Sequence, residues 1–131
     1  MKLKITFLLL AFCVFSVSVF AQQASRNIEV KFRKGAISRT YSDNVSRSVN
    51  TYYLRARRGQ TLTVKITSPG NIARFHVGTI SPGSRDESDI KFIAEGDLTY
   101  YKYKINTDDE IAIPVGAIRN GSSYKLTITI K

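Results

Sequence analysis

Residue types that support catalysis are scarce in this 131-residue chain. It has one histidine (His76), one cysteine (Cys13) and no tryptophan. Cys13 lies in the apolar N-terminal segment described below, so a chain without that segment has no disulfide and no thiol chemistry. A lone histidine lacks the second histidine or cysteine that a catalytic pair or a metal site would need. The sequence therefore predicts no catalytic residue, no metal site and no cofactor, and it argues against an enzyme.

Long apolar runs are also absent, except at the N-terminus. Residues 5–20 are almost unbroken in their apolar character and follow Lys2 and Lys4, while Val19 and Ala21 place small residues at the −3 and −1 positions of a cleavage site. The run of about 16 residues is shorter than the roughly 20 that span a bilayer. We therefore predict a cleaved signal peptide over residues 1–21, with no membrane insertion afterwards. Residues 22–131 then form a single exported domain, periplasmic or secreted.

Acidic residues are in the minority. Without Lys2 and Lys4 the chain has 18 of its 20 Lys and Arg against 10 Asp and Glu, a net charge of +8. A basic exported protein is attracted to acidic surfaces such as anionic lipid, acidic glycan or a carboxylate-lined cleft in another protein. Export argues against nucleic acid as a partner, and the lack of a long exposed apolar run favours a monomer.

Helical periodicity is absent, and alternation of apolar and polar residues takes its place. Such alternation indicates strands with one buried and one wet face. It predicts inward side chains for Leu62, Val64, Ile66, Phe75 and Val77, and outward ones for Tyr53 and His76. The runs are residues 28–33, 52–57, 61–67, 73–77, 90–93, 98–105, 111–115 and 124–130. About eight short strands separated by turn residues predict an all-β domain, an antiparallel β-sandwich.

Local signals add three expectations to this fold. The Arg58-Gly59 turn predicts a hairpin between residues 52–57 and 61–67. Pro114 cannot donate to a ladder, so its strand is expected at an edge or with a bulge. Residues 81–89 are polar and are expected to form a mobile loop.

Four segments together resemble one protein family. They are residues 27–35, the Thr-Tyr-Ser step at 40–42, the tyrosine, arginine and Gly-Gln run at 51–60, and the closing strand at 124–131. They are similar to the periplasmic inhibitors of g-type lysozyme. The resemblance implies a small β-sandwich whose partner is a g-type lysozyme, and whose surface loops block the substrate cleft of that enzyme without chemistry of their own.

The resemblance also implies where the lysozyme would bind. Arg119 and Asn120 match the family's inhibitory loop, and Arg119 is the expected inserted cation. The loop closes early here, through Gly121, whereas members of the family have a longer loop with a second arginine. Arg47 and Ser48 stand where the family presents an aromatic contact residue. The predicted lysozyme-binding residues are thus Arg119, Asn120, Arg47 and Ser48.

A second function remains open from the residues alone. Tyr100 shares a strand face with Lys102 and Lys104, and an exposed tyrosine can stack on a sugar ring. This pattern predicts, as the alternative, a non-enzymatic exported module that binds glycan or another envelope component.

Overall fold

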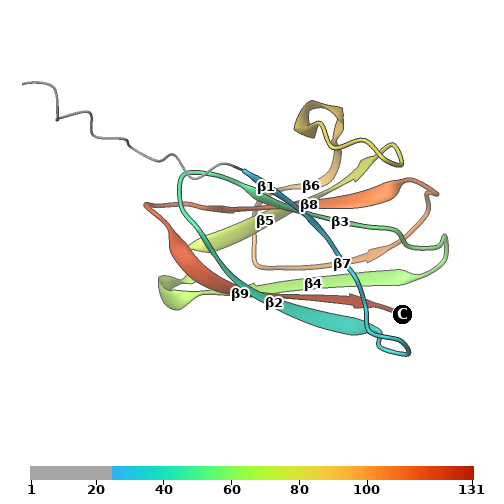
Figure 1. Ribbon diagram of the computed structural model, residues 1–131, viewed down its shortest axis with the longest axis horizontal. Coiled ribbons are helices and arrows are strands. Elements are labelled where there is room, and N and C mark those ends of the chain that lie inside the picture. The colour runs from blue at the N-terminus through green and yellow to red at the C-terminus, as the bar shows by residue number, and fades with distance from the viewer. Residues whose placement is uncertain (1–24) are drawn as a thin grey trace, which may run out of the picture.

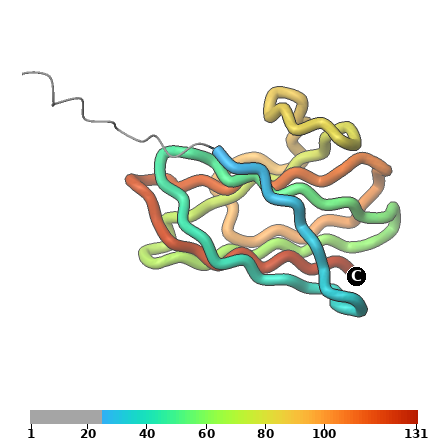
Figure 2. The backbone as a smooth tube through the Cα atoms, viewed as in Figure 1, coloured from blue at the N-terminus to red at the C-terminus, as the bar shows by residue number. Residues whose placement is uncertain are grey.

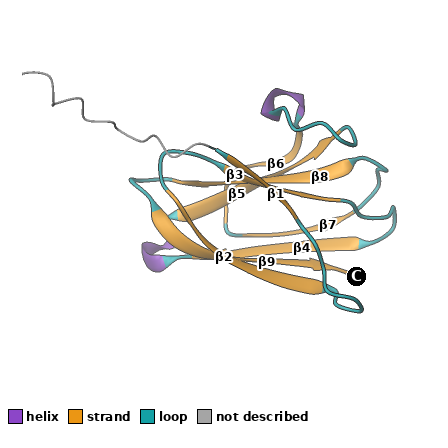
Figure 3. Cartoon of the chain, viewed as in Figure 1, coloured by secondary structure: helices purple, strands orange, loops and turns teal. Residues whose placement is uncertain are grey.

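The computed structural model describes residues 25–131, which form strands joined by turns (Figure 3). The elements are β1 (Arg26–Glu29), β2 (Ser38–Val45), β3 (Asn50–Leu54), β4 (Thr61–Thr67), η1 (Pro69–Asn71), β5 (Ala73–Ile80), η2 (Glu87–Asp89), β6 (Lys91–Leu98), β7 (Tyr100–Lys104), β8 (Glu110–Ala117) and β9 (Ser122–Ile130). Both η elements are single 3₁₀ turns. Within this range, no helix has the length and apolar character needed to cross a membrane. The predicted signal peptide lies outside the described residues.

The strands form two sheets that pack face to face (Figure 1). The five-stranded sheet has the order β1-β3-β8-β5-β6 and the four-stranded sheet the order β2-β9-β4-β7. Neighbouring strands are antiparallel except for β1 and β3, which are parallel. The predicted all-β, largely antiparallel sandwich is confirmed, with nine described strands instead of about eight.

Alternating apolar residues fill the space between the sheets. Leu62, Val64 and Ile66 of β4 are buried, as are Phe75 and Val77 of β5, so the inward residues predicted for these two strands are confirmed. The first strand is shorter than its alternation suggested, because pairing ends at Glu29. Its apolar side chains still pack on the core, and they are Ile28, Val30 and Phe32.

A second, smaller apolar cluster lies on the outer side of the five-stranded sheet. Tyr53, Ile80, Ile90 and Ala112 form it, beneath the segment of residues 81–90 at the top of Figure 1. Because this segment covers Tyr53, both faces of β3 are buried. Sequence alternation had placed Tyr53 on a wet face, which is wrong for that reason.

The segment of residues 81–90 is fastened to the sheet through Arg85. The Arg85 guanidinium lies 4.2 Å from the centre of the Tyr53 ring and pairs with Glu29 at 2.7 Å and with Glu110 at 2.9 Å. Glu110 is only 2% exposed and also accepts a hydrogen bond from the Gly83 backbone N–H. The segment is irregular, as expected for a loop, but these contacts fasten it to the sheet. Its sequence gave no sign of them, because Glu29 and Glu110 are distant in the chain.

The predicted hairpin between residues 52–57 and 61–67 does not form. β3 pairs with β1 and β8 in one sheet, whereas β4 pairs with β7 and β9 in the other. The turn at residues 57–60 crosses between the sheets, with Gly59 at φ 94° and the Gln60 side chain accepting from the Arg57 N–H. The alternation therefore predicted both strands correctly, but the Gly59 turn between them did not show that they belong to different sheets.

Pro114 lies in β8, at the centre of the five-stranded sheet, so the predicted edge position is wrong. On one side it pairs in register with Thr51 of β3. On the other side the ladder to β5 has no pair between Phe75–Val115 and Gly78–Ala112. This gap includes Pro114, which has no backbone N–H to donate. A central strand can therefore contain this proline without an unmade hydrogen bond in the ladder.

The edge strands β2 and β6 have little apolar alternation in their sequences, so they were hard to predict. β2 was not predicted, because its sequence is polar and only Val45 at its end is buried. The Glu95-Gly96-Asp97 sequence predicts a turn, but β6 runs through it, with Gly96 at φ 111°. Edge strands lack the apolar alternation of central strands, since one of their sides meets solvent.

Gly78 of β5 lies very close to Ile90 and Lys91, so a substitution there tests how tightly β5 packs against them. A Cβ at this position would lie 2.4 Å from Ile90 Cγ2 and 2.8 Å from the Lys91 carbonyl oxygen. We expect Gly78→Ala to lower the free energy of unfolding by about 2 kcal/mol. The matched control is Gly116→Ala in β8, where nothing lies within 4 Å of the added Cβ. Equal urea midpoints for the two variants would contradict this packing.

The ionisation of Glu110 allows a pH test of its contacts with Arg85 and Gly83, which hold residues 81–90 on the sheet. Burial alone would raise the pKa of Glu110, but the Gly83 hydrogen bond and the Arg85 guanidinium outweigh it, so the pKa lies below the ordinary 4.5. Its contribution to stability is then full above pH 4.5 and is lost as the pH falls through the folded-state pKa. We expect Glu110→Gln to cost about 2 kcal/mol at pH 7, because Arg85 loses its buried partner.

Urea unfolding at pH 7 and at decreasing pH measures this effect. The difference in stability between the wild type and Glu110→Gln should shrink below pH 4.5. A difference that stays constant down to pH 3 would show that the charge of Glu110 does not hold the segment.

Candidate functional site

Two corners of the chain meet at one end of the sandwich. Residues 46–49 carry the chain from β2 in the four-stranded sheet to β3 in the five-stranded sheet, and residues 118–121 carry it back from β8 to β9. β2 pairs with β9 and β3 pairs with β8. The two corners therefore lie side by side, at the left end of the molecule in Figure 2.

A depression of about 380 Å³ lies between these corners. Residues 46–49 line one side of it and residues 116–120 the other. Arg47, Ser48, Arg119 and Asn120, which are far apart in the sequence, all face this one feature. The structure thus gathers the four residues that the sequence predicted for lysozyme binding.

Close packing fixes the corner at residues 118–121. Gly121 has φ 138°, and a Cβ there would lie 2.8 Å from the Val45 carbonyl oxygen, so glycine allows the corner to pass against the end of β2. The Ile118 N–H donates to the Ile72 carbonyl oxygen at 3.1 Å, which ties the corner to the turn after η1. Arg119 is thus presented by a constrained corner.

A buried polar cluster supports the other corner from within the core. The Tyr52 and Tyr124 hydroxyls lie 2.6 Å apart, and the Asn50 side-chain amide donates to the Tyr124 hydroxyl and to the Asn44 carbonyl oxygen. Burial raises the pKa of both tyrosines, so both phenols stay neutral. The cluster joins the end of β2 to the start of β3 and to β9, next to Arg47.

Arg47 and Arg119 differ from the arginines that form ion pairs within the protein. Arg26 pairs with Asp43, Arg58 with Asp108, and Arg85 with two carboxylates. Arg47 and Arg119 are exposed and make no ion pair or side-chain hydrogen bond with any residue of the described range. No carboxylate lines the depression between them. The site therefore presents two available guanidinium groups.

A smaller hollow of about 140 Å³ continues the depression onto the outer face of the five-stranded sheet. It shares Val49 and residues 116–118 with the depression and adds Arg74, His76 and Asp97. Arg74 was not predicted as a site residue, because an arginine on the wet face of a strand has no distinguishing sequence signal. His76 lies on the outer face, as its phase predicted, where its Nδ1 accepts a hydrogen bond from the Gly96 N–H and its ring packs on Phe92.

This arrangement is suited to binding and offers little for catalysis. Guanidinium groups bind carboxylates through paired hydrogen bonds, and the Ser48 hydroxyl and Asn120 amide add uncharged hydrogen-bonding groups. Across residues 25–131, no group of three or more His, Cys, Asp or Glu side chains is placed to hold a metal ion.

Arg55, Arg58 and Tyr100 do not line the depression. Arg55 pairs with Glu110, and Arg58 pairs with Asp108 at the opposite end of the sandwich. Tyr101 and Tyr103 stack on each other and pack against the core, while Tyr100 is 57% exposed on the outer face of the four-stranded sheet.

Comparisons with known proteins identify similar structures but no family from sequence alone. No protein-family model matches the sequence, and no curated protein matches it. Aeromonas hydrophila PliG, a periplasmic inhibitor of g-type lysozyme, superposes with a TM-score of 0.68 at 26% identity. That alignment covers 82% of this chain and 98% of the PliG chain.

A second PliG has the same arrangement. Salmonella Typhimurium PliG, also a periplasmic inhibitor of g-type lysozyme, superposes with a TM-score of 0.58 at 24% identity, over 81% of this chain and 98% of its own. The nearly complete coverage of both neighbours means that their whole folds are reproduced. The described part of this chain therefore has the PliG-like fold.

Proposed function

We propose that this protein is a periplasmic inhibitor of g-type lysozyme, and that the depression between its two corners is the inhibitory surface. The observation that carries the proposal is the coincidence of two facts. The chain shares its fold and 26% of its aligned residues with a PliG inhibitor. Two arginines that have no ion-pair partner among the described residues, Arg47 and Arg119, face one depression at the end of that fold.

The target's chemistry explains why arginines suit this role. Enzymes that hydrolyse glycosidic bonds generally carry acidic residues in their clefts. A guanidinium group can bind a carboxylate through two parallel hydrogen bonds, and such contacts are strongest when the partners exclude water. We propose that Arg119 enters the lysozyme cleft and binds an acidic group there, with Asn120 beside it.

Arg47 compensates for the short loop. The resemblance to the inhibitor family implies a longer loop with a second arginine, which the early turn at Gly121 removes here. Arg47 reaches the same depression from the neighbouring corner. We assign it the second cationic contact, with Ser48 as a hydrogen-bonding neighbour.

The mode of action is occlusion in the periplasm, without a reaction. A rigid edge of the sandwich enters the substrate cleft and leaves the enzyme's catalytic groups intact. The protein accordingly needs no cofactor, and its partner is a protein. Inhibition should be reversible and should follow the occupancy of the complex.

A peptidoglycan-lysis assay with g-type lysozyme tests this proposal. Purified protein should inhibit the g-type enzyme, and Arg119→Ala should raise the half-inhibitory concentration at least about tenfold, equivalent to about 1.4 kcal/mol. Arg47→Ala should have a smaller effect in the same direction. The matched control is Arg58→Ala, because Arg58 is exposed at the opposite end and its surface ion pair contributes little.

Two results would contradict the proposal. One is a folded wild-type protein that does not inhibit g-type lysozyme. The other is an equal effect of Arg119→Ala and Arg58→Ala, which would exclude the corner as the inhibitory surface. Parallel assays with c-type and i-type lysozymes would show whether the inhibition is selective.

A further inference from the structure

The outer face of the four-stranded sheet has an unusual composition. Its outward side chains alternate with the buried rows of β4 and β9, such as Leu62, Val64, Leu126 and Ile128. Apart from Asn44 and Tyr100, every outward residue of the four strands is serine, threonine or lysine. No acidic or aliphatic side chain points outward there.

Four lysines give this face its charge. Strand register places Lys65 opposite Tyr100, Lys102 opposite Thr63, and Lys104 opposite Thr61. Lys125 lies opposite Thr67 on the neighbouring pair of strands. All four lysines are exposed, and none forms an ion pair with another described residue. The face therefore carries uncompensated positive charge.

Hydroxyl groups fill the space between the lysines. Thr40 and Thr127 are joined by a side-chain hydrogen bond of 2.9 Å across β2 and β9, and Ser38 and Thr129 by one of 3.0 Å. Hydroxyls can both donate and accept, so such a surface matches the hydroxyls and amides of sugars. Tyr100 adds an exposed aromatic ring on which a sugar can stack.

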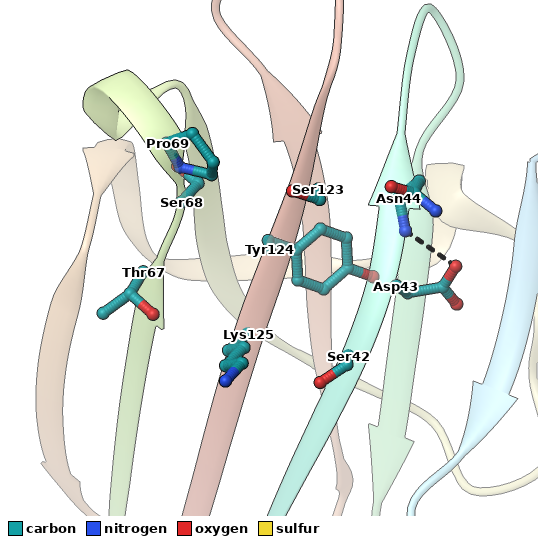
Figure 4. Close-up of a pocket in the computed structure, with 9 residues that line it drawn as sticks. All are labelled: Ser42, Asp43, Asn44, Thr67, Ser68, Pro69, Ser123, Tyr124 and Lys125. Atoms are coloured by element: carbon teal, nitrogen blue, oxygen red, sulfur yellow. Dashed lines mark hydrogen bonds between the residues drawn. The ribbon is translucent and has the colours of Figure 1, made fainter.

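One end of this face is hollowed (Figure 4). A depression of about 590 Å³ spans β4, β9 and β2. Figure 4 shows Thr67 and Ser68 on one side, Lys125 in the middle and Ser42 on the other. Asp43 also lines the depression, but it is paired with Arg26 of the other sheet. Its volume is in the range of about 300–1,000 Å³ typical of ligand sites.

We propose that this face binds peptidoglycan, the polymer that lysozymes attack. The polymer combines sugar hydroxyls and acetamido groups with peptide carboxylates, which match the threonines, Tyr100 and the lysines. The choice of this polymer rests on the proposed periplasmic role. An anionic bilayer matches less well, because interfacial binding relies on apolar side chains that enter the lipid, and the outward residues of these strands include none except Tyr100.

The two surfaces can act together. The depression of Figure 4 shares no lining residue with the depression between Arg47 and Arg119. The two depressions meet at the same end of the sandwich, where Asn44 and Ser123 line one and Ser46 and Asn120 line the other. Arg47 and Arg119 themselves are not part of the sheet face that we propose to hold peptidoglycan. Binding to the wall would raise the local concentration of the inhibitor where the enzyme works.

Co-sedimentation with purified, protein-free peptidoglycan sacculi tests the proposal in the absence of lysozyme. At about 0.15 M salt, the wild type should sediment with the sacculi. The triple variant Lys65→Gln/Lys102→Gln/Lys125→Gln should bind at least about tenfold more weakly. Tyr100→Ala should weaken binding severalfold without any change of charge.

Matched controls separate a specific face from net charge. Lys31→Gln/Lys34→Gln/Lys91→Gln removes three exposed lysines that lie off this face, and it should retain wild-type binding. Arg119→Ala should also bind sacculi normally, and the triple variant of the sheet face should still inhibit lysozyme free in solution. If the wild type did not inhibit lysozyme, the binding of the protein to sacculi could still be measured and interpreted by itself.

Three outcomes would overturn the proposal. The first is a wild type that does not sediment with sacculi. The second is an equal loss of binding in the two triple variants, which would reduce the effect to net charge. The third is stronger binding to vesicles of phosphatidylethanolamine and phosphatidylglycerol, lost in the sheet-face variant, which would assign the face to a membrane.

Discussion

The candidate site depends on the pairing of two strands in each sheet. β2 lies against β9 and β3 lies against β8, so the chain crosses between the sheets twice at one end of the sandwich. Each crossing begins and ends in a strand that is held by a ladder of hydrogen bonds, and Gly121 lets the corner at residues 118–121 pass close to the end of β2. Arg47 and Arg119 owe their proximity to this constraint. A rigid end of this kind binds with little loss of conformational entropy, which favours tight inhibition.

The arginines of this protein fall into two groups, those with a carboxylate partner in the fold and those without one among the described residues. Arg85 is held by Glu29 and Glu110 and fastens residues 81–90 over Tyr53, so its charge is used within the fold. Arg47 and Arg119 have no such partners among the described residues. The lysines of the four-stranded sheet are likewise unpaired, but they are spread over a broad, hydroxyl-rich face. Two kinds of basic surface therefore suit two kinds of acidic partner, a narrow cleft and an extended polymer.

Sequence alone predicted the layers of this fold better than its connections. Alternation identified β4, β5 and β9 and their buried residues, because a central strand must place apolar side chains on its inner face. It did not reveal that residues 57–60 join two sheets, or that Pro114 lies in a central strand where a gap in the ladder accommodates it. The residues of the candidate site came from resemblance to a family. Their convergence on one depression depends on distant strand pairing, which no local pattern encodes.

The most direct test of the central claim is hydrogen–deuterium exchange of the protein, alone and in complex with g-type lysozyme. If the end of the sandwich enters the cleft, backbone amides of residues 46–49 and 118–121 should become protected in the complex. Amides of residues 57–60 and 105–109, at the opposite end, should exchange as in the free protein. Protection confined to the opposite end, with no change at the two corners around Arg47 and Arg119, would contradict the account.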